Sequence, residues 1–131
     1  MDKNNLVLDV KNLFVRYETE DGIVRAVNGL NLQIERGKAI GLVGETGAGK
    51  TTTALSLLRL IPKPPGVEEC DKMVLDGLDM LSLSVKELEK VRGKDISMIF
   101  QDPMTALNPV FTVGDQIAES IFLHEEVTYA E

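Results

Sequence analysis

The segment from residue 44 to residue 51 constrains this chain more than any other feature of its sequence. It reads Gly44-Glu45-Thr46-Gly47-Ala48-Gly49-Lys50-Thr51, which matches the pattern G-x-x-x-x-G-K-T at every defined position. Glycine adopts backbone angles that other residues avoid, so such a loop turns several backbone N–H groups inward around a dense anion. A helix after the loop adds the positive end of its dipole. The pattern therefore predicts a loop that binds the phosphates of a nucleotide.

The segments on either side of this loop predict the strand and the helix that the pattern requires. Residues 39–43 form a short apolar run, which is typical of a buried parallel strand. Residues 52–60 have the apolar content of a largely buried helix, and prolines from Pro62 onward end it. A strand, this loop and a helix in that order predict an α/β fold of the P-loop NTPase class. A chance glycine-rich turn is the alternative, and the flanking segments disfavour it.

The first third of the chain predicts antiparallel β structure. Apolar and polar residues alternate over residues 6–10, 13–17 and 30–34, which indicates strands with one buried and one exposed face. Glu20-Asp21-Gly22 is a turn signal between them.

The region after the loop predicts shorter elements. Residues 73–75 and 96–100 read as strands, and Ser84 with Glu87 forms a capping box at the start of a short helix. The apolar stripe of that helix comprises Val85, Leu88 and Val91. An irregular loop follows over residues 101–111, and Thr112 is the predicted N-cap of a last helix.

Charge and composition exclude several functions. The net charge is −7, and it belongs entirely to the last part of the chain, since residues 95–131 hold no Lys or Arg. The acids there are Asp95, Asp102, Asp115, Glu119, Glu125, Glu126 and Glu131. No basic patch supports nucleic-acid binding. The chain has no long apolar run and no secretory leader, and its lone Cys70 reads as an incidental thiol, so we expect a cytoplasmic protein.

A second motif narrows the class. Phe100-Gln101-Asp102-Pro103-Met104-Thr105-Ala106-Leu107-Asn108-Pro109 resembles the Q-loop of ABC-type ATPases. This motif, including Leu107-Asn108-Pro109, is similar to that of the ATP-binding subunits of bacterial oligopeptide, dipeptide and nickel importers. Residues 15–17 and 110–117 support the same resemblance. Asp102 ends a hydrophobic run as a Walker B aspartate would, but Gln101 before it and Pro103 after it fit the Q-loop instead.

The resemblance implies a domain organisation. Residues 1–36 would form an antiparallel β subdomain, 37–100 the P-loop core, 101–112 the Q-loop and 113–131 the start of a helical subdomain. The core sheet would be incomplete in this chain, because the signature motif, the Walker B strand with its catalytic glutamate, the D-loop and the switch histidine of the family do not occur in the sequence. His124 reads instead as an exposed helix residue.

The resemblance also implies site residues. Tyr17 would stack on adenine, Lys50 would contact the β- and γ-phosphates, and Gln101 would reach Mg²⁺ and the attacking water. Thr51 would ligate Mg²⁺ together with Gln101. The nucleotide-binding loop would comprise Gly44, Glu45, Thr46, Gly47, Ala48, Gly49, Lys50, Thr51 and Thr52.

The same resemblance predicts the biological setting. The chain would be the N-terminal part of the ATP-binding component of a peptide-type importer, peripheral on the inner face of the cell membrane. Its partners would be a second ATP-binding subunit and, through the Q-loop region, transmembrane permease subunits. A nucleotide-binding regulatory module without turnover is the alternative. We expect the 131-residue chain itself to bind ATP, to hydrolyse it negligibly and to self-associate.

Overall fold

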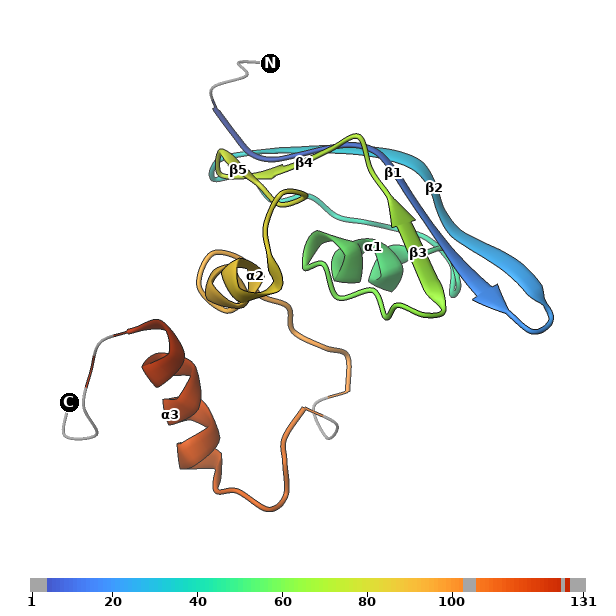
Figure 1. The fold of residues 1–131 in the computed structure, drawn as a ribbon. Helices are drawn as coiled ribbons and strands as arrows, with labels where there is room; N and C mark the ends of the chain where they lie inside the picture. The colour runs from blue at the N-terminus through green and yellow to red at the C-terminus, as the bar shows by residue number, and fades with distance from the viewer. Residues whose placement is uncertain (1–4, 103–105, 126, 128–131) are drawn as a thin grey trace. The chain divides into compact units, whose positions relative to one another are not determined.

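A computed structural model describes residues 5–102, 106–125 and 127. The chain forms two compact units, residues 1–83 and 84–131, which are described separately (Figure 1). Within the described ranges, no helix is both long and apolar enough to cross a membrane.

The first unit is built on a long β-hairpin. β1 (Leu6–Thr19) and β2 (Gly22–Glu35) pair antiparallel from Leu6 opposite Glu35 to Thr19 opposite Gly22. The turn falls at the predicted Glu20-Asp21-Gly22 signal. The alternation of apolar and polar residues therefore predicted both the strands and their antiparallel pairing correctly.

Two short strands share the other edge of β1. β3 (Gly66–Glu69) pairs antiparallel with Phe14–Tyr17, and β4 (Lys72–Leu75) pairs with Leu8–Lys11. β3 and β4 thus follow one another along a single strand, and β5 (Leu78–Asp79) pairs with β4 (Figure 1). The predicted strand at residues 73–75 is confirmed, whereas β3 and β5 were not predicted.

A bulge in β1 keeps its apolar side chains on one face. Leu8, Val10, Leu13 and Val15 are all buried, yet the step from Val10 to Leu13 is odd and would put them on opposite faces of a regular strand. The pairing with β2 shifts between these two residues, and Asn12 has φ 50°. The extra residue restores the phase, so both halves of β1 face the same core.

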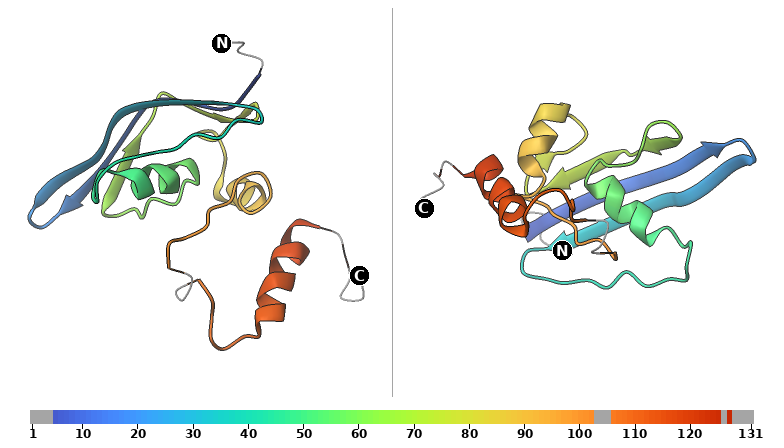
Figure 2. Two further views of the ribbon diagram at one scale, coloured as in Figure 1. Left: turned by 180° about the vertical axis from the view of Figure 1, so that it is seen from behind. Right: turned by 90° about the horizontal axis from the view of Figure 1, so that it is seen from below.

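Helix α1 (Lys50–Leu57) lies against that face (Figures 1 and 2). The buried apolar residues of this unit are Leu8, Val10, Leu13, Val15, Val27, Leu58, Ile61, Met73, Leu75 and Met80. The sequence predicted a helix over residues 52–60, and the helix is there, but it begins at Lys50 and ends at Leu57.

The prediction of a buried strand over residues 39–43 is wrong in this structure. The segment is irregular, and its side chains are exposed, with Val43 94% accessible. A parallel strand is stable when neighbours pair with its backbone and cover both its faces. Among the described residues, no strand pairs with this segment, so its apolar character alone does not form a strand.

The described residues of the second unit form two helices. The capping box of Ser84 and Glu87 starts α2 (Val85–Val91), and the Thr112 hydroxyl accepts from the Asp115 N–H at the start of α3 (Val113–His124), so both predicted caps are confirmed. Leu88 and Val91 of the predicted α2 stripe are buried, but Val85 is exposed.

The predicted strand at residues 96–100 is also wrong. Ile96 makes one isolated parallel bridge with Arg92, and the rest of the segment is irregular, with Ile99 98% accessible. Residues 96–100 do not form a strand for the same reason as residues 39–43: no described strand lies beside the segment to pair with its backbone.

Candidate nucleotide-binding site

The predicted phosphate loop is a tight turn at the start of α1. Gly47 and Gly49 have φ of 84° and 83°, in the left-handed region that side chains disfavour. The Ala48 N–H donates to the Glu45 carbonyl at 3.1 Å, which closes the turn. Gly49, a glycine that the motif defines, and Gly47, at a position that the motif leaves open, therefore both occupy backbone conformations that suit glycine.

Lys50 points back into this loop. Its Nζ donates to the carbonyl oxygens of Gly44 at 2.6 Å and Glu45 at 2.7 Å. The ammonium group thus lies inside the turn formed by residues 44–49, with a positive charge where an anion held by the loop's N–H groups would be bound.

The N-terminus of α1 adds to this positive potential. Gly49 is its N-cap, no side chain accepts a hydrogen bond there, and the first turn contains no acidic residue. Uncapped N–H groups and the helix dipole together favour an anion at this end. The Thr53 hydroxyl is not available to it, because it donates to the Gly49 carbonyl at 2.9 Å.

The opposite end of α1 is held by a part-buried ion pair. After the helix, Arg59 donates to Glu68 of β3 at 2.7 Å, and the Glu68 side chain is only 1% exposed. Lys63 lies 3.4 Å from the same carboxylate. This contact ties the helix that starts at the phosphate loop to the sheet.

A hollow lies beside the loop. The residues that line it come from β2, from the exposed segment before the loop and from α1: Ala26, Val27, Asn28, Leu30, Leu42, Val43, Ala48, Lys50 and Thr53. It places apolar side chains next to the lysine, an arrangement typical of small-molecule sites.

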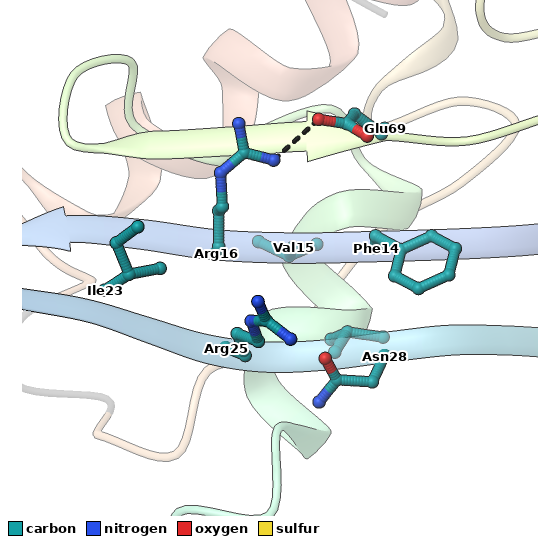
Figure 3. A pocket seen from close by; sticks show the side chains of 8 residues that line it. Phe14, Val15, Arg16, Ile23, Arg25, Asn28 and Glu69 are labelled. Carbon is teal, nitrogen blue, oxygen red and sulfur yellow. Dashed lines mark hydrogen bonds and ion pairs between the residues drawn. The ribbon is translucent and has the colours of Figure 1, made fainter.

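A second hollow lies on the hairpin, where Phe14, Arg16 and Arg25 are among the residues that line it (Figure 3). Here Arg16 forms ion pairs with Glu69 at 2.6 Å and with Glu18 at 3.4 Å, and the hydrogen bond to Glu69 raises the pKa of the Arg16 guanidinium. Arg25 is directly opposite Arg16 on β2. This hollow contains none of the predicted site residues, although Val27 and Asn28 line both it and the hollow beside the loop.

The structure places Tyr17 on the α1 side of the sheet. It alternates with Arg16 and so shares the face of the buried Val15. A side-chain carbon added to Gly66, which pairs with Tyr17, would lie 3.4 Å from the tyrosine ring. Tyr17 and the phosphate loop thus belong to the same unit and the same sheet face, while adenine stacking stays a prediction.

Gln101 belongs to the second unit, where it is exposed in irregular backbone. Its predicted contact with Mg²⁺ stays a prediction, and Pro103, Met104 and Thr105 of the Q-loop motif lie outside the described residues. Asp102, rejected above as a metal ligand, is also exposed.

Gln116 organises the end of the Q-loop motif, a role that sequence reasoning missed. From α3, its side-chain amide accepts from the Asn108 N–H at 2.8 Å and donates to the Asn108 carbonyl at 2.9 Å. It also donates to the Phe111 carbonyl at 3.2 Å. These hydrogen bonds connect the Leu107-Asn108-Pro109 turn to the first turns of α3.

Cys70, which the sequence predicted to be an incidental thiol, is a half-buried free cysteine that forms hydrogen bonds with the backbone. The thiol donates to the carbonyl of Lys11 at 3.3 Å and to that of Lys72 at 3.1 Å. Burial raises the pKa of the thiol, which keeps it protonated and unreactive.

Comparison with known proteins identifies the family. The ABC transporter family model matches residues 27–130. The chain is 44% identical over 122 residues to the oligopeptide transport ATP-binding protein OppD of Bacillus subtilis, covering 93% of this chain and 34% of OppD. It is 45% identical over 129 residues to the probable peptide ABC transporter ATP-binding protein y4tR of Sinorhizobium fredii, covering 98% and 38%.

A third relative is the glutathione import ATP-binding protein GsiA of Escherichia coli O157:H7, 44% identical over 136 residues, covering 100% of this chain and 22% of GsiA. The chain thus spans about a third of the first two relatives and less of the third. The match to the family covers the phosphate loop, α1 and the Q-loop motif. This chain therefore belongs to the ABC transporter family, within the P-loop NTPase class.

Proposed function

We propose that this chain binds Mg·ATP through residues 44–51, as the nucleotide-binding part of an ABC-type ATP-binding subunit. The observation that carries the proposal is the position of Lys50, whose Nζ lies within the loop at 2.6 and 2.7 Å from two of its carbonyl oxygens. The uncapped start of α1 directly follows it. Lys50 and the N-terminus of α1 therefore both supply positive potential where a triphosphate would be held.

The donor chemistry of the first turn of α1 fits Mg²⁺. Thr51 is exposed there and presents a hydroxyl oxygen, a ligand type that Mg²⁺ accepts beside phosphate oxygens and water. Bound Mg²⁺ would supply charge neutralisation at the phosphates. Lys50 would contact the β- and γ-phosphates, Thr52 would contribute to the loop's binding surface, and the ring of Tyr17 would pack on adenine.

For the longer protein we propose coupling of ATP hydrolysis to import of peptides or a related solute. Relatives named for oligopeptide, peptide and glutathione transport support this solute class. Gln101 would orient the attacking water, and the Q-loop region would contact permease subunits. A second ATP-binding subunit would complete the assembly, on the cytoplasmic face of the membrane.

Calorimetric titration of the chain with Mg·ATP tests the binding proposal. Lys50→Ala should abolish measurable binding, because it removes the charge at the β- and γ-phosphates. Lys38→Ala is the matched control, since Lys38 is an exposed lysine that follows β2 and precedes the loop. Equal affinities for wild type and Lys50→Ala would refute the proposal.

A further inference from the structure

β2 carries one extra residue where it passes the phosphate loop. The register pairs Val15 with Val27 and Arg16 with Arg25, so Ala26 has no partner on β1. Such a bulge redirects the backbone groups of the unpaired residue, and bulges are common beside functional sites.

Gly49 lies directly against this bulge. A side-chain carbon built on Gly49 would lie 2.2 Å from the Ala26 carbonyl oxygen and 3.3 Å from its carbonyl carbon. The Ala26 carbonyl therefore occupies the space of a side chain at residue 49. Ala26 and Lys50 also line the same hollow.

Fixing Gly49 fixes the parts of the loop that would contact phosphate. Its carbonyl accepts both the N–H of Thr53 at 2.8 Å and the hydroxyl of Thr53 at 2.9 Å, so its position sets the first turn of α1. Lys50 is the next residue, and its side chain returns into the loop from that point. A binding site of this kind requires its groups to be held within about 0.5 Å of the productive geometry.

We propose that the Ala26 bulge is a positioning element for the phosphate loop: its backbone carbonyl holds Gly49, and through Gly49 the start of α1 and Lys50. The inference rests on the proposed nucleotide binding and adds that the β1–β2 hairpin sets the geometry of the loop. Ala26 acts through its main chain, and its side chain is not required.

Deletion of Ala26 separates this role from the stability of the hairpin. Without that residue, the pairs Val15–Val27 and Arg16–Arg25 would follow one another in a regular ladder, and the side chains on both sides would keep their faces. We expect the urea midpoint to stay equal or rise. The affinities for Mg·ATP and for inorganic triphosphate with Mg²⁺ should both fall at least about tenfold.

Ala26→Gly is the matched control, since it keeps the bulge and the carbonyl and removes only the methyl group. Its affinity for inorganic triphosphate should stay within about threefold of wild type, which is a smaller change than the fall in affinity expected for the deletion variant. Because this probe has no base or ribose, contacts to those groups do not affect the result. The proposal is overturned if the deletion variant binds triphosphate as wild type does, or if Ala26→Gly loses as much as the deletion.

If the deletion variant does not unfold cooperatively, carbonyl NMR of the wild-type chain tests the inference instead. With ¹³C at alanine carbonyls, saturating Mg²⁺ and triphosphate should shift the Ala26 resonance and leave that of Ala118 in α3 unchanged. An unmoved Ala26 resonance would overturn the inference. Failure of the wild-type chain to bind either ATP or triphosphate would instead refute the proposed function itself.

Discussion

The apolar segments at residues 39–43 and 96–100 are richer in apolar residues than the β1–β2 hairpin, yet the hairpin is the region whose apolar side chains are buried. In the hairpin, Leu13 and Val15 are 0% and 1% exposed, whereas Val43 and Ile99 are 94% and 98% exposed. The hairpin residues find their pairing partner in the next strand along the chain, and β3 and β4 cover the other edge of β1. An apolar run thus specifies a preference for burial, while the partner that buries it must come from elsewhere.

The largest expected effect of this difference is on stability. Leu13→Ala should lower the free energy of unfolding by about 2–5 kcal/mol, because it leaves a cavity between the sheet and α1. Leu42→Ala, which removes the same atoms from a half-exposed side chain, should change it by less than about 1 kcal/mol. Urea unfolding followed by circular dichroism measures both. Equal losses would show that residues 39–43 are as well packed as the hairpin.

A smaller effect is expected on association. Exposed apolar side chains favour contacts between copies of the chain, so the wild type should self-associate at micromolar concentrations. Replacing Val43 and Ile99 together by Lys should shift the population toward monomer in light scattering after size exclusion. Replacing the exposed hairpin residues Ile23 and Val24 by Lys is the matched control and should shift it less, since those residues belong to a paired strand. A monomeric wild type would contradict this prediction.

The smallest effect concerns pH. The hydrogen bond from Lys72 to Asp9, with a second from Gln33, holds the pKa of the Asp9 carboxyl below its ordinary value of 3.8. A lowered folded pKa means that the contribution of Asp9 to stability is fully present above pH 3.8 and is lost as the pH falls through the folded pKa. In Asp9→Asn, the free energy of unfolding should therefore decrease less than in wild type as the pH falls, as measured by urea unfolding between pH 5 and about pH 2.

Asp21→Asn, in the exposed hairpin turn, is the control and should leave the acid limb of the stability curve unchanged. An identical acid limb for Asp9→Asn and wild type would mean that the ion pair with Lys72 does not contribute to stability.

Sequence patterns predicted the elements whose determinants are local. Period-two alternation located β1 and β2, and the hydroxyl side chains of Ser84 and Thr112 located the starts of α2 and α3. The glycine-lysine motif located the turn and helix of the candidate site, including the left-handed Gly49. Each of these signals acts over a few residues, so the sequence displays it directly.

Features that depend on distant partners were missed. β3 follows a proline-rich segment and has one large apolar residue, Val67, so its pairing with β1 left no pattern in the sequence. The contact between Ala26 and Gly49 depends on a register shift, which shows in the sequence only as a break in alternation near residues 23–27. The roles of Tyr17 and Gln101 came from resemblance and remain predictions.

The use of both edges of β1 has a kinetic consequence. β2 pairs with β1 across a short turn. The pairing of β3 with β1 begins with Tyr17 opposite Gly66, so it closes the much longer stretch of chain between these two residues. Closing a longer stretch costs more chain entropy, so the hairpin forms first and the β1–β3 ladder later. The phosphate loop and α1 lie inside the stretch that this late step closes. During refolding, the chain would therefore acquire its hairpin before it becomes competent to bind a nucleotide.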